Sequence, residues 1–336
     1  MATGRQAQGM LSMPLTFRPT YQTVVWGGRR LARWRRDLPA GPIGESWDLA
    51  DHPRGMSVVA GGPLAGMTLA DLTRRFGSDL VGVGFAGGDF PLLVKTIDAN
   101  DTLSVQVHPD DELAVHLGVG NRGKTECWYL LADGGHLFAG TVPGTTANGF
   151  AAAVTAGTVA ESLNRYASHA RDFFFLPARR VHALGAGCLI VEIQQTCDVT
   201  FRVFDWGRVG LDGKPRQLHI DQAMATIDFA PAECGPVMAA VVAHPAGGAV
   251  RKLADCTYFT VEERILTPGG RTRGEAAGAC SIVMPIAGGG WLSTAAGGIE
   301  LDLLRPALIP AIAGGWRLGA GHDGLRALVA QPRFVG

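Results

Sequence analysis

The sequence carries little charge, and the two signs cancel. Charged residues make up 18% of the 336 positions, against about 25% in typical globular domains. The formal net charge is zero and the pI is about 7.1. A neutral chain exerts no long-range attraction on phosphate backbones or anionic lipid headgroups. We therefore expect no nucleic-acid partner and no membrane partner, and a small molecule as the ligand.

Long apolar runs and paired cysteines are also missing. No run of about 20 residues, the length that spans a bilayer, is apolar without interruption by charge, Gly or Pro. The first residues contain no apolar segment of the secretory kind. The six cysteines form no C-x-x-C pair, which is typical of buried, reduced thiols. The sequence predicts a cytoplasmic protein in which residues 1–13 form an unstructured lead-in.

The signature motifs of several enzyme classes are absent. There is no G-x-G-x-x-G after a predicted strand, no G-x-x-x-x-G-K-[ST] loop, no G-x-S-x-G elbow and no H-E-x-x-H helix. The glycine-rich segment 82–88 precedes a predicted strand, so it offers a phosphate no helix N-terminus. A bound phosphate must therefore be held by arginine and lysine side chains.

Glycine and proline, in contrast, are abundant, with 47 and 19 residues. They separate short apolar runs, a pattern that predicts many short strands joined by tight turns. Helical spacing and capping residues predict helices over 68–77, 109–118 and 218–228, and an Ala-rich helical insertion over about 145–166. An Asp-Gly-Gly turn predicts that the two strands within 125–142 form a hairpin.

A segment rich in Pro and Gly at 231–236 separates two groups of predicted strands. Beyond it the pattern becomes a meander of short strands. We therefore expect a mainly β protein of two β-sandwich units. Its first domain covers residues 14–235 and contains the helical insertion, and a smaller C-terminal β domain covers 236–336.

One predicted strand carries polar side chains on a single face. In LSVQVHPDDELA, residues 103–114, the period of two places Ser104, Gln106 and His108 on one face, opposite the apolar residues. Burying isolated polar groups costs on the order of a few kcal/mol each. We therefore expect them to converge with the polar residues of other predicted strands. Those residues are Glu126, His182, Glu192 and Arg202.

Three of these residues are of the types that bind zinc. His108, Glu126 and His182 offer two imidazoles and a carboxylate, and Gln106 offers a fourth, neutral oxygen. The set suits one Zn²⁺ per chain best, although Fe²⁺ or Mn²⁺ would accept two histidines and a carboxylate. The alternative is a group of ordinary hydrogen-bonded histidines and solvated surface charges.

Lysine is scarce, with four residues against 26 arginines. This bias would readily supply arginine wherever any cation suffices. Lys95 and Lys124 nevertheless lie close in sequence to the proposed ligands. Their presence indicates that a compact ammonium group is needed there.

An ordered series of segments runs from about Phe17 to Ile227. It consists of VVWGG, GESWDLADH, GGPLAG, FPLLVKTIDA, LSVQVHPDD, GKTECWYLL, VHALGAGCLIVEIQQ, TFRVFDWGR and LHI. This series resembles the type I mannose-6-phosphate isomerases of the short bacterial kind, zinc enzymes of the cupin superfamily. The resemblance implies a cupin jelly-roll for the first domain, with zinc held by Gln106, His108, Glu126 and His182. The last hundred residues are similar only in being rich in strands.

The resemblance also implies an activity, the interconversion of mannose 6-phosphate and fructose 6-phosphate through a cis-enediolate. It places Ser104 and, less firmly, Lys95 beside the substrate, together with Lys124, Glu192 and Arg202. Arg202 would add positive charge near the enediolate or assist ring opening. Lys124 or Glu192 would carry the proton between C1 and C2, and a zinc-bound water is another proton carrier.

The sequence departs from the family pattern in two segments. Arg179 and Arg180 stand shortly before His182, where small residues are usual, so they are either solvated or add attraction for a phosphate. Gly207 stands in FDWGR where an acid is common, so any role of that acid is missing. Two other hypotheses remain, a non-catalytic sugar-binding cupin and an iron-dependent cupin oxygenase. The sequence is compatible with a monomer or a homodimer.

Overall fold

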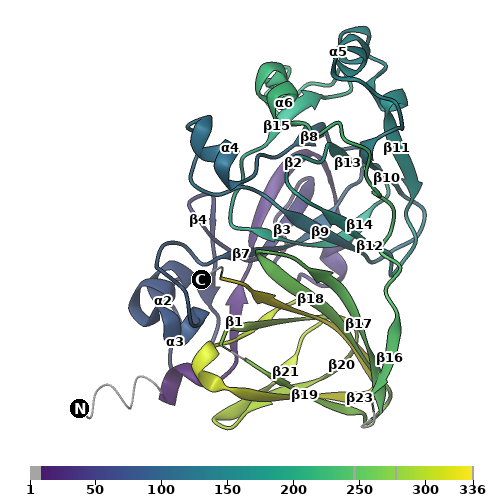
Figure 1. Ribbon diagram of the computed structural model, residues 1–336. Helices are drawn as coiled ribbons and strands as arrows, with labels where there is room; N and C mark the ends of the chain where they lie inside the picture. The colour runs from purple at the N-terminus through teal and green to yellow at the C-terminus, as the bar shows by residue number, and fades with distance from the viewer. Residues whose placement is uncertain (1–8, 245–246, 277, 335–336) are drawn as a thin grey trace. The chain divides into compact units, whose positions relative to one another are not determined.

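The computed structural model describes residues 9–244, 247–276 and 278–334 (Figure 1). The chain divides into two compact units. Unit 1 combines the chain up to Thr20 with residues 47–93 and the chain from Met238 onward, and unit 2 combines residues 21–46 and 94–237. The sequence pattern predicted a linear division near residue 235. The structure instead places the segment up to Thr20 and residues 47–93 in the same unit as the chain from Met238 onward.

Unit 1 is built on one large antiparallel sheet. Among the described residues its strand order is β16–β17–β18–β23–β20–β22–β1–β6, with β19 on β23 and β21 on β20. The bounds are β1 Leu15–Arg18, β6 Val58–Val59, β16 Val241–His244, β17 Gly248–Asp255, β18 Phe259–Leu266, β19 Arg271–Glu275, β20 Ser281–Thr294, β21 Gly297–Leu301, β22 Ala307–Ile309 and β23 Gly315–Pro332. The long strands β20 and β23 pair with each other, and their inward residues, Val283, Leu292 and Leu318 among them, form an apolar core.

The remaining elements of unit 1 are short. They are the strand pair β4 Asp51–His52 and β5 Gly55–Met56, the helices α2 Leu69–Phe76 and α3 Ser78–Val81, and the 3₁₀ turn η3 Ala311–Ala313. The helix predicted over 68–77 is confirmed as α2. Thr68 caps it, because its side-chain oxygen accepts a hydrogen bond from the Asp71 N–H at 3.0 Å.

The start of the chain differs from the expected unstructured lead-in over residues 1–13. Residues 1–8 lie outside the described residues. Residues 9–11 are helical, and the side chain of Leu11 is fully buried. The Ser12 carbonyl accepts a hydrogen bond from the Thr294 hydroxyl at 2.7 Å, so this segment is tied to the end of β20.

A buried carboxylate lies between two arginines in the sheet of unit 1. Glu263 on β18 is fully buried, and its two oxygens lie 2.9 Å from Arg251 Nη1 and 2.8 Å from Arg326 Nη1. We expect Glu263→Gln to lower the free energy of unfolding by about 2–4 kcal/mol, because it removes the charge that balances both guanidinium groups. Chemical denaturation would measure this loss. The exposed Glu300→Gln is the matched control, and an equal loss in both variants would contradict the prediction.

Unit 2 contains two sheets. The smaller has the order β11–β10–β13–β8–β15, and the larger β12–β9–β14–β7–β3–β2. The bounds are β2 Thr20–Gly28, β3 Ile43–Leu49, β7 Leu92–Asp98, β8 Val105–Val107, β9 Glu126–Leu130, β10 His136–Thr141, β11 Leu163–Ala167, β12 Phe173–Leu176, β13 His182–Leu184, β14 Leu189–Gln195 and β15 Phe201–Phe204. A core that includes Trp26, Trp128 and Leu137 joins strands of both sheets. Unit 2 is thus a β-sandwich.

Helices cover the outer face of the smaller sheet. The helical elements of unit 2 are η1 Arg30–Arg33, α4 Asp111–His116, α5 Ala147–Ala156, η2 Val159–Ser162 and α6 Ile220–Thr226. Phe150 of α5 and Ala223 of α6 pack in one cluster with Val105 and Val107 of β8. Because side chains alternate along a strand, Gln106 between these valines faces the inside of the sandwich. Helices α4, α5 and α6 lie where the sequence predicted helices, whereas η1 was not predicted and residues 163–166 of the expected insertion belong to β11.

The hairpin predicted within 125–142 is wrong. Strand β9 pairs with β12 and β14 in the larger sheet, whereas β10 pairs with β11 and β13 in the smaller one. The turn at 131–135 therefore connects two sheets and does not close a two-stranded ribbon. A turn motif indicates that the chain reverses, but the choice of partner strand depends on which apolar faces must be covered.

Candidate metal centre

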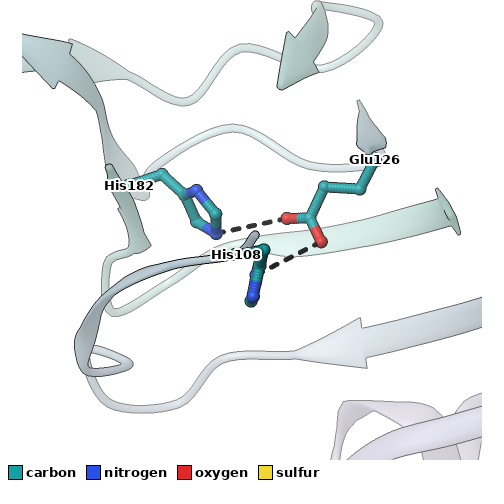
Figure 2. A group of neighbouring side chains, drawn as sticks. All are labelled: His108, Glu126 and His182. Carbon is teal, nitrogen blue, oxygen red and sulfur yellow. Dashed lines mark ion pairs between the residues drawn. The ribbon is translucent and has the colours of Figure 1, made fainter. Parts of the chain in front are cut away.

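Two histidines and a glutamate converge inside the sandwich of unit 2. Figure 2 shows His182 and His108 directed at different oxygens of the Glu126 carboxylate. His182 Nε2 lies 3.3 Å from Oε1, and His108 Nε2 lies 3.6 Å from Oε2. Each residue offers one ligand atom, and these three atoms lie within 4.8 Å of one another. All three side chains are buried.

Both sheets contribute to this cluster. His108 directly follows β8 and His182 begins β13, both in the smaller sheet, whereas Glu126 begins β9 in the larger one. Gln106 on β8 is the register partner of His182, and its Nε2 lies 3.4 Å from His182 Nε2. The predicted ligand residues thus come together across the interior, and the Gln106 amide lies beside the three.

The two imidazoles are oriented by backbone carbonyls. His108 Nδ1 lies 2.8 Å from the Val199 carbonyl oxygen, and His182 Nδ1 lies 2.7 Å from that of Arg180. A carbonyl accepts only, so each Nδ1 carries the proton and donates it. Each Nε2 therefore presents a lone pair toward Glu126, which is the arrangement of a metal-binding histidine with its supporting acceptor.

The donor set fits a divalent cation. No group among the described residues donates a well-directed hydrogen bond to either oxygen of the fully buried Glu126 carboxylate, although Oε2 forms an ion pair with Lys124 Nζ at 2.9 Å. A buried carboxylate lacking hydrogen bonds is costly unless a cation compensates it. Two neutral imidazoles, a carboxylate and an amide oxygen are ligands that Zn²⁺, Fe²⁺ and Mn²⁺ accept.

Burial keeps both imidazoles neutral. Desolvation lowers the pKa of His182 to about 4, with a smaller contribution from the Lys124 charge. Desolvation, together with Lys124 and His182, also holds the pKa of His108 well below its usual range. At neutral pH both rings therefore have the protonation state that a metal requires.

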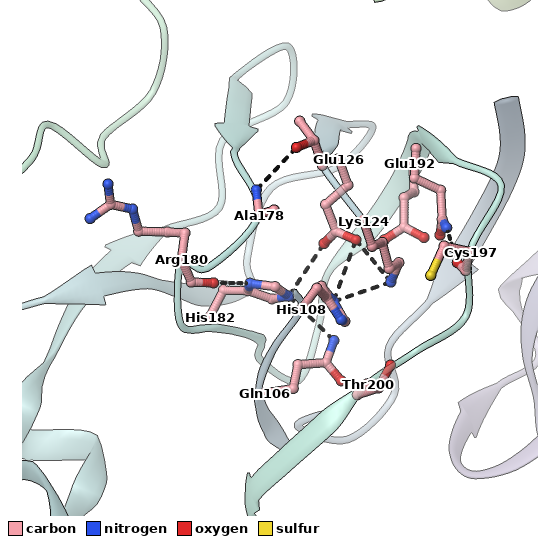
Figure 3. A network of polar contacts seen from close by, with 12 residues as sticks. Gln106, His108, Lys124, Glu126, Ala178, Arg180, His182, Glu192, Cys197 and Thr200 are labelled. Carbon is pink, nitrogen blue, oxygen red and sulfur yellow. Dashed lines mark hydrogen bonds and ion pairs between the residues drawn. The ribbon is translucent and has the colours of Figure 1, made fainter. Parts of the chain in front are cut away.

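Two lysines and two further acids surround the cluster, and Figure 3 shows Lys124 and Glu192 among them. Lys124 Nζ lies 3.2 Å from His108 Nε2 as well as 2.9 Å from Glu126 Oε2. Glu192 on β14 has both oxygens engaged, with Lys95 Nζ 2.9 Å from Oε1 and the Trp128 indole N–H donating to Oε2 at 2.9 Å. Lys95 Nζ also lies 3.6 Å from Glu45 Oε2. The lysines and acids therefore alternate, and each buried charge faces an opposite one.

The charges of this network are fixed by their neighbours. Burial would favour a neutral Glu192, but the Lys95 and Lys124 ammonium groups outweigh it and lower the pKa of Glu192 to about 2. Burial likewise opposes a charged Lys124, yet Glu126 and Glu192 hold its pKa above the usual value. Burial and the charge of Glu192 raise the pKa of Glu126. A positive group in contact with Glu126, whether Lys124 or a metal ion, favours its ionised form.

Arg202 lies on β15, which pairs with β8, and Ser104 directly precedes β8. Arg202 of β15 is the register partner of Gln106, so its side chain leaves the sheet on the inward face. Its Nη1 donates to the Gln217 carbonyl at 2.7 Å, and its Nε is buried with no hydrogen-bond partner among the described residues. Ser104 is buried just before β8, two residues from Gln106.

Sequence reasoning missed two members of the network, Trp128 and Glu45. Trp128 packs edge-on against His182, with ring centroids 5.3 Å apart, and bonds Glu192. It follows Glu126 by two residues on β9, so strand alternation would have placed it on the same face. Glu45 lies on β3, and no sequence feature ties it to Lys95.

The chain matches known proteins along most of its length. Residues 15–124 match the model of the catalytic domain of type I phosphomannose isomerases. A mannose-6-phosphate isomerase of Bacillus subtilis strain 168 is 38% identical over 222 residues, which cover 65% of this chain and 69% of that protein. The chain belongs to the type I mannose-6-phosphate isomerase family. A second member, from Streptococcus mutans, is 36% identical over 234 residues, 67% of this chain and 72% of the relative.

Solved structures of mannose-6-phosphate isomerases have the same fold. The enzyme crystallised from Bacillus subtilis aligns with a TM-score of 0.85 and 28% identity, over 95% of this chain and 99% of the other. The mainly β architecture that the sequence predicted is therefore confirmed as that of this isomerase family. Within the described residues, no helix is both long and apolar enough to cross a bilayer.

Proposed function

We propose that this family member interconverts mannose 6-phosphate and fructose 6-phosphate. The observation that carries the proposal is the buried group of His108, Glu126 and His182 with Lys124 in contact with two of them, in a chain whose relatives are mannose-6-phosphate isomerases. A sugar-binding protein that is not an enzyme would not need a buried ammonium group beside side chains of the kind that bind metal ions.

The proposed ligands are Gln106, His108, Glu126 and His182, and the preferred metal is Zn²⁺, one per chain. A bound Zn²⁺ would act as a Lewis acid that polarises the sugar oxygens at C1 and C2. The chain itself orients the two imidazoles through the Val199 and Arg180 carbonyls.

The isomerisation moves a proton between C1 and C2 through a cis-enediolate, so one side chain must reach both carbons. Of the two side-chain candidates, the geometry favours Lys124. Its Nζ contacts the ligand atoms directly, whereas both Glu192 oxygens are engaged by Lys95 and Trp128. Lys95 holds Glu192 in place through their ion pair. As the carrier, Lys124 must take the proton from one carbon as the neutral amine and return it to the other carbon as the ammonium. A cation bound to Glu126 would compensate the carboxylate charge and so favour the neutral amine.

Arg202 supplies positive charge on the inward face, where it stabilises the enediolate or assists ring opening, and Ser104 offers a hydroxyl to the sugar. The substrate phosphate needs guanidinium groups nearby. Arg208 and Arg216 share one carboxylate, Asp205, at 2.9 and 2.7 Å. Arg208 Nη1 also lies 3.4 Å from Asp101 Oδ2, so two carboxylates balance the two guanidinium groups, and a phosphate dianion bound here would displace one of these ion pairs.

A direct assay tests the function. Purified protein is incubated with mannose 6-phosphate, and fructose 6-phosphate is measured by a coupled assay, before and after complete metal removal by a chelator. We expect turnover that is lost with the metal and restored by Zn²⁺. Full turnover of the metal-free protein would reject the metal mechanism. Mannose and other hexose phosphates serve as comparison substrates, while oxygen uptake with bound iron would indicate an oxygenase instead.

A further inference from the structure

A turn at residues 177–180 contacts all three segments that carry the His–Glu–His cluster. The Ala178 N–H donates to the Thr125 hydroxyl at 3.1 Å, next to Glu126 in the chain (Figure 3). The Arg179 N–H donates to the carbonyl oxygen of His108 at 2.7 Å. The Arg180 carbonyl accepts the Nδ1–H of His182 at 2.7 Å. Three successive residues therefore each hold one ligand-bearing segment.

The central residue of this turn has an unusual backbone. Arg179 has a φ of +71°, in the left-handed region that favours glycine, and the Arg180 N–H closes the turn onto the Pro177 carbonyl at 3.2 Å. The third position of such a turn is normally glycine. A bulky residue persists there only when surrounding contacts determine its conformation.

The Arg179 side chain supplies such contacts. Its Nε donates to the Thr226 carbonyl at the end of α6 at 3.1 Å, and its Nη1 lies 3.7 Å from Asp110 Oδ2. Asp110 also caps α4, since its Oδ1 accepts from the Leu113 N–H at 2.9 Å. In addition, the Arg179 carbonyl accepts from the Asp228 N–H at 3.0 Å. Arg179 is thus tied to the segment after His108 and to the end of α6.

We propose that Arg179 is a positioning residue of the metal centre: it anchors the 177–180 turn, which sets the spacing of His108, Glu126 and His182. This inference rests on the metal site of the proposed function. It adds a third role to the two expected from sequence: the Arg179 side chain is exposed, yet its Nε and Nη1 contact protein groups. It acts on the ligands through backbone groups, without touching substrate.

The test measures metal binding and needs no turnover. Arg179→Ala keeps the Cβ, and so the backbone strain, while it removes the contacts to Thr226 and Asp110. The affinity for Zn²⁺ is measured by competition with a chromophoric chelator, and the visible spectrum of the Co²⁺ form reports the coordination geometry. We expect a loss of zinc affinity of about tenfold or more, as for other residues that support metal ligands, and an altered Co²⁺ spectrum.

Arg180→Ala is the matched control. Its side chain points away from the cluster in Figure 3 and makes no hydrogen bond or ion pair in the part of the chain that is described, whereas its carbonyl is retained. We expect its zinc affinity to stay within twofold of the parent protein. Arg179→Gly removes the side chain and also the strain, so it should be more heat-stable than Arg179→Ala without the metal and still bind zinc weakly.

Parental zinc affinity in Arg179→Ala or Arg179→Gly, or an equal loss in Arg180→Ala, would overturn the inference. If Arg179→Ala does not fold, Thr125→Val tests the same turn by removing the acceptor of the Ala178 N–H, and unchanged zinc affinity would again count against it. A parent protein that binds zinc but lacks isomerase activity would refute the proposed function and leave this inference standing.

Discussion

His108→Ala is expected to abolish the binding of one metal ion per chain. It should also lower kcat/KM for mannose 6-phosphate by about 10³-fold or more. The variant removes one of three clustered ligand atoms and leaves Glu126 and His182 to hold the ion. A Lewis acid contributes several kcal/mol to the stabilisation of a developing oxyanion. Because about 1.4 kcal/mol corresponds to a tenfold change in rate, a loss of three orders of magnitude follows.

The measurement combines elemental analysis with the coupled assay. His116→Ala is the control, because His116 is an exposed histidine in the last turn of α4, eight residues from the cluster in sequence. It should retain the metal and the activity. Full activity in a His108→Ala protein shown to be free of metal would mean that the cluster is not the catalytic centre.

Lys124→Met is expected to separate catalysis from metal binding. The substitution keeps the length and apolar stem of the side chain but removes the ammonium group that lies 2.9 Å from Glu126 and 3.2 Å from His108. Loss of a proton-transfer group typically costs 10²–10⁴ in rate, so we expect kcat to fall by about that factor. The metal should be retained, and bound no more weakly, because a positive charge next to its ligands has been removed.

Exchange of the C2 hydrogen of the substrate with solvent gives a second readout for Lys124→Met, since it reports proton transfer even without product release. It should be lost in parallel with turnover. Lys252→Met, at an exposed lysine of β17, is the control for replacing a lysine by methionine. If Lys124→Met kept its exchange rate while Glu192→Gln lost it, the proton carrier would be Glu192.

The sequence predicted the faces of strand β8 correctly. Val105 and Val107 lie under α5 and α6, and Gln106 lies beside His182 on the other face. This result follows from geometry alone, since successive side chains of any strand point to opposite sides. The capped helix α2 was predictable for the same kind of reason, because Thr68 and Asp71 interact within one turn.

The pairing of strands was not predictable in this way. The turn after β9 has an Asp-Gly-Gly sequence, which is typical of hairpins, yet β9 and β10 belong to different sheets. Similarly, β1 and β6 near the N-terminus complete the sheet formed by the last hundred residues. Such pairings join residues far apart in sequence, and their stability comes from burying faces that no local pattern specifies.

For the candidate metal centre, the sequence by itself determined the chemistry: the imidazoles, the carboxylate and two of the chain's four lysines stand in or beside strands where burial would otherwise be unfavourable. Only the tertiary structure decided their arrangement, which brings His108 and His182 from one sheet against Glu126 from the other. It also adds Trp128 and Glu45 to the network. Finally, it places the Arg179 N–H against the His108 carbonyl. The physical reason is that alternation and capping act over a few residues, whereas a buried ionic cluster is compensated only by groups that folding brings from distant strands.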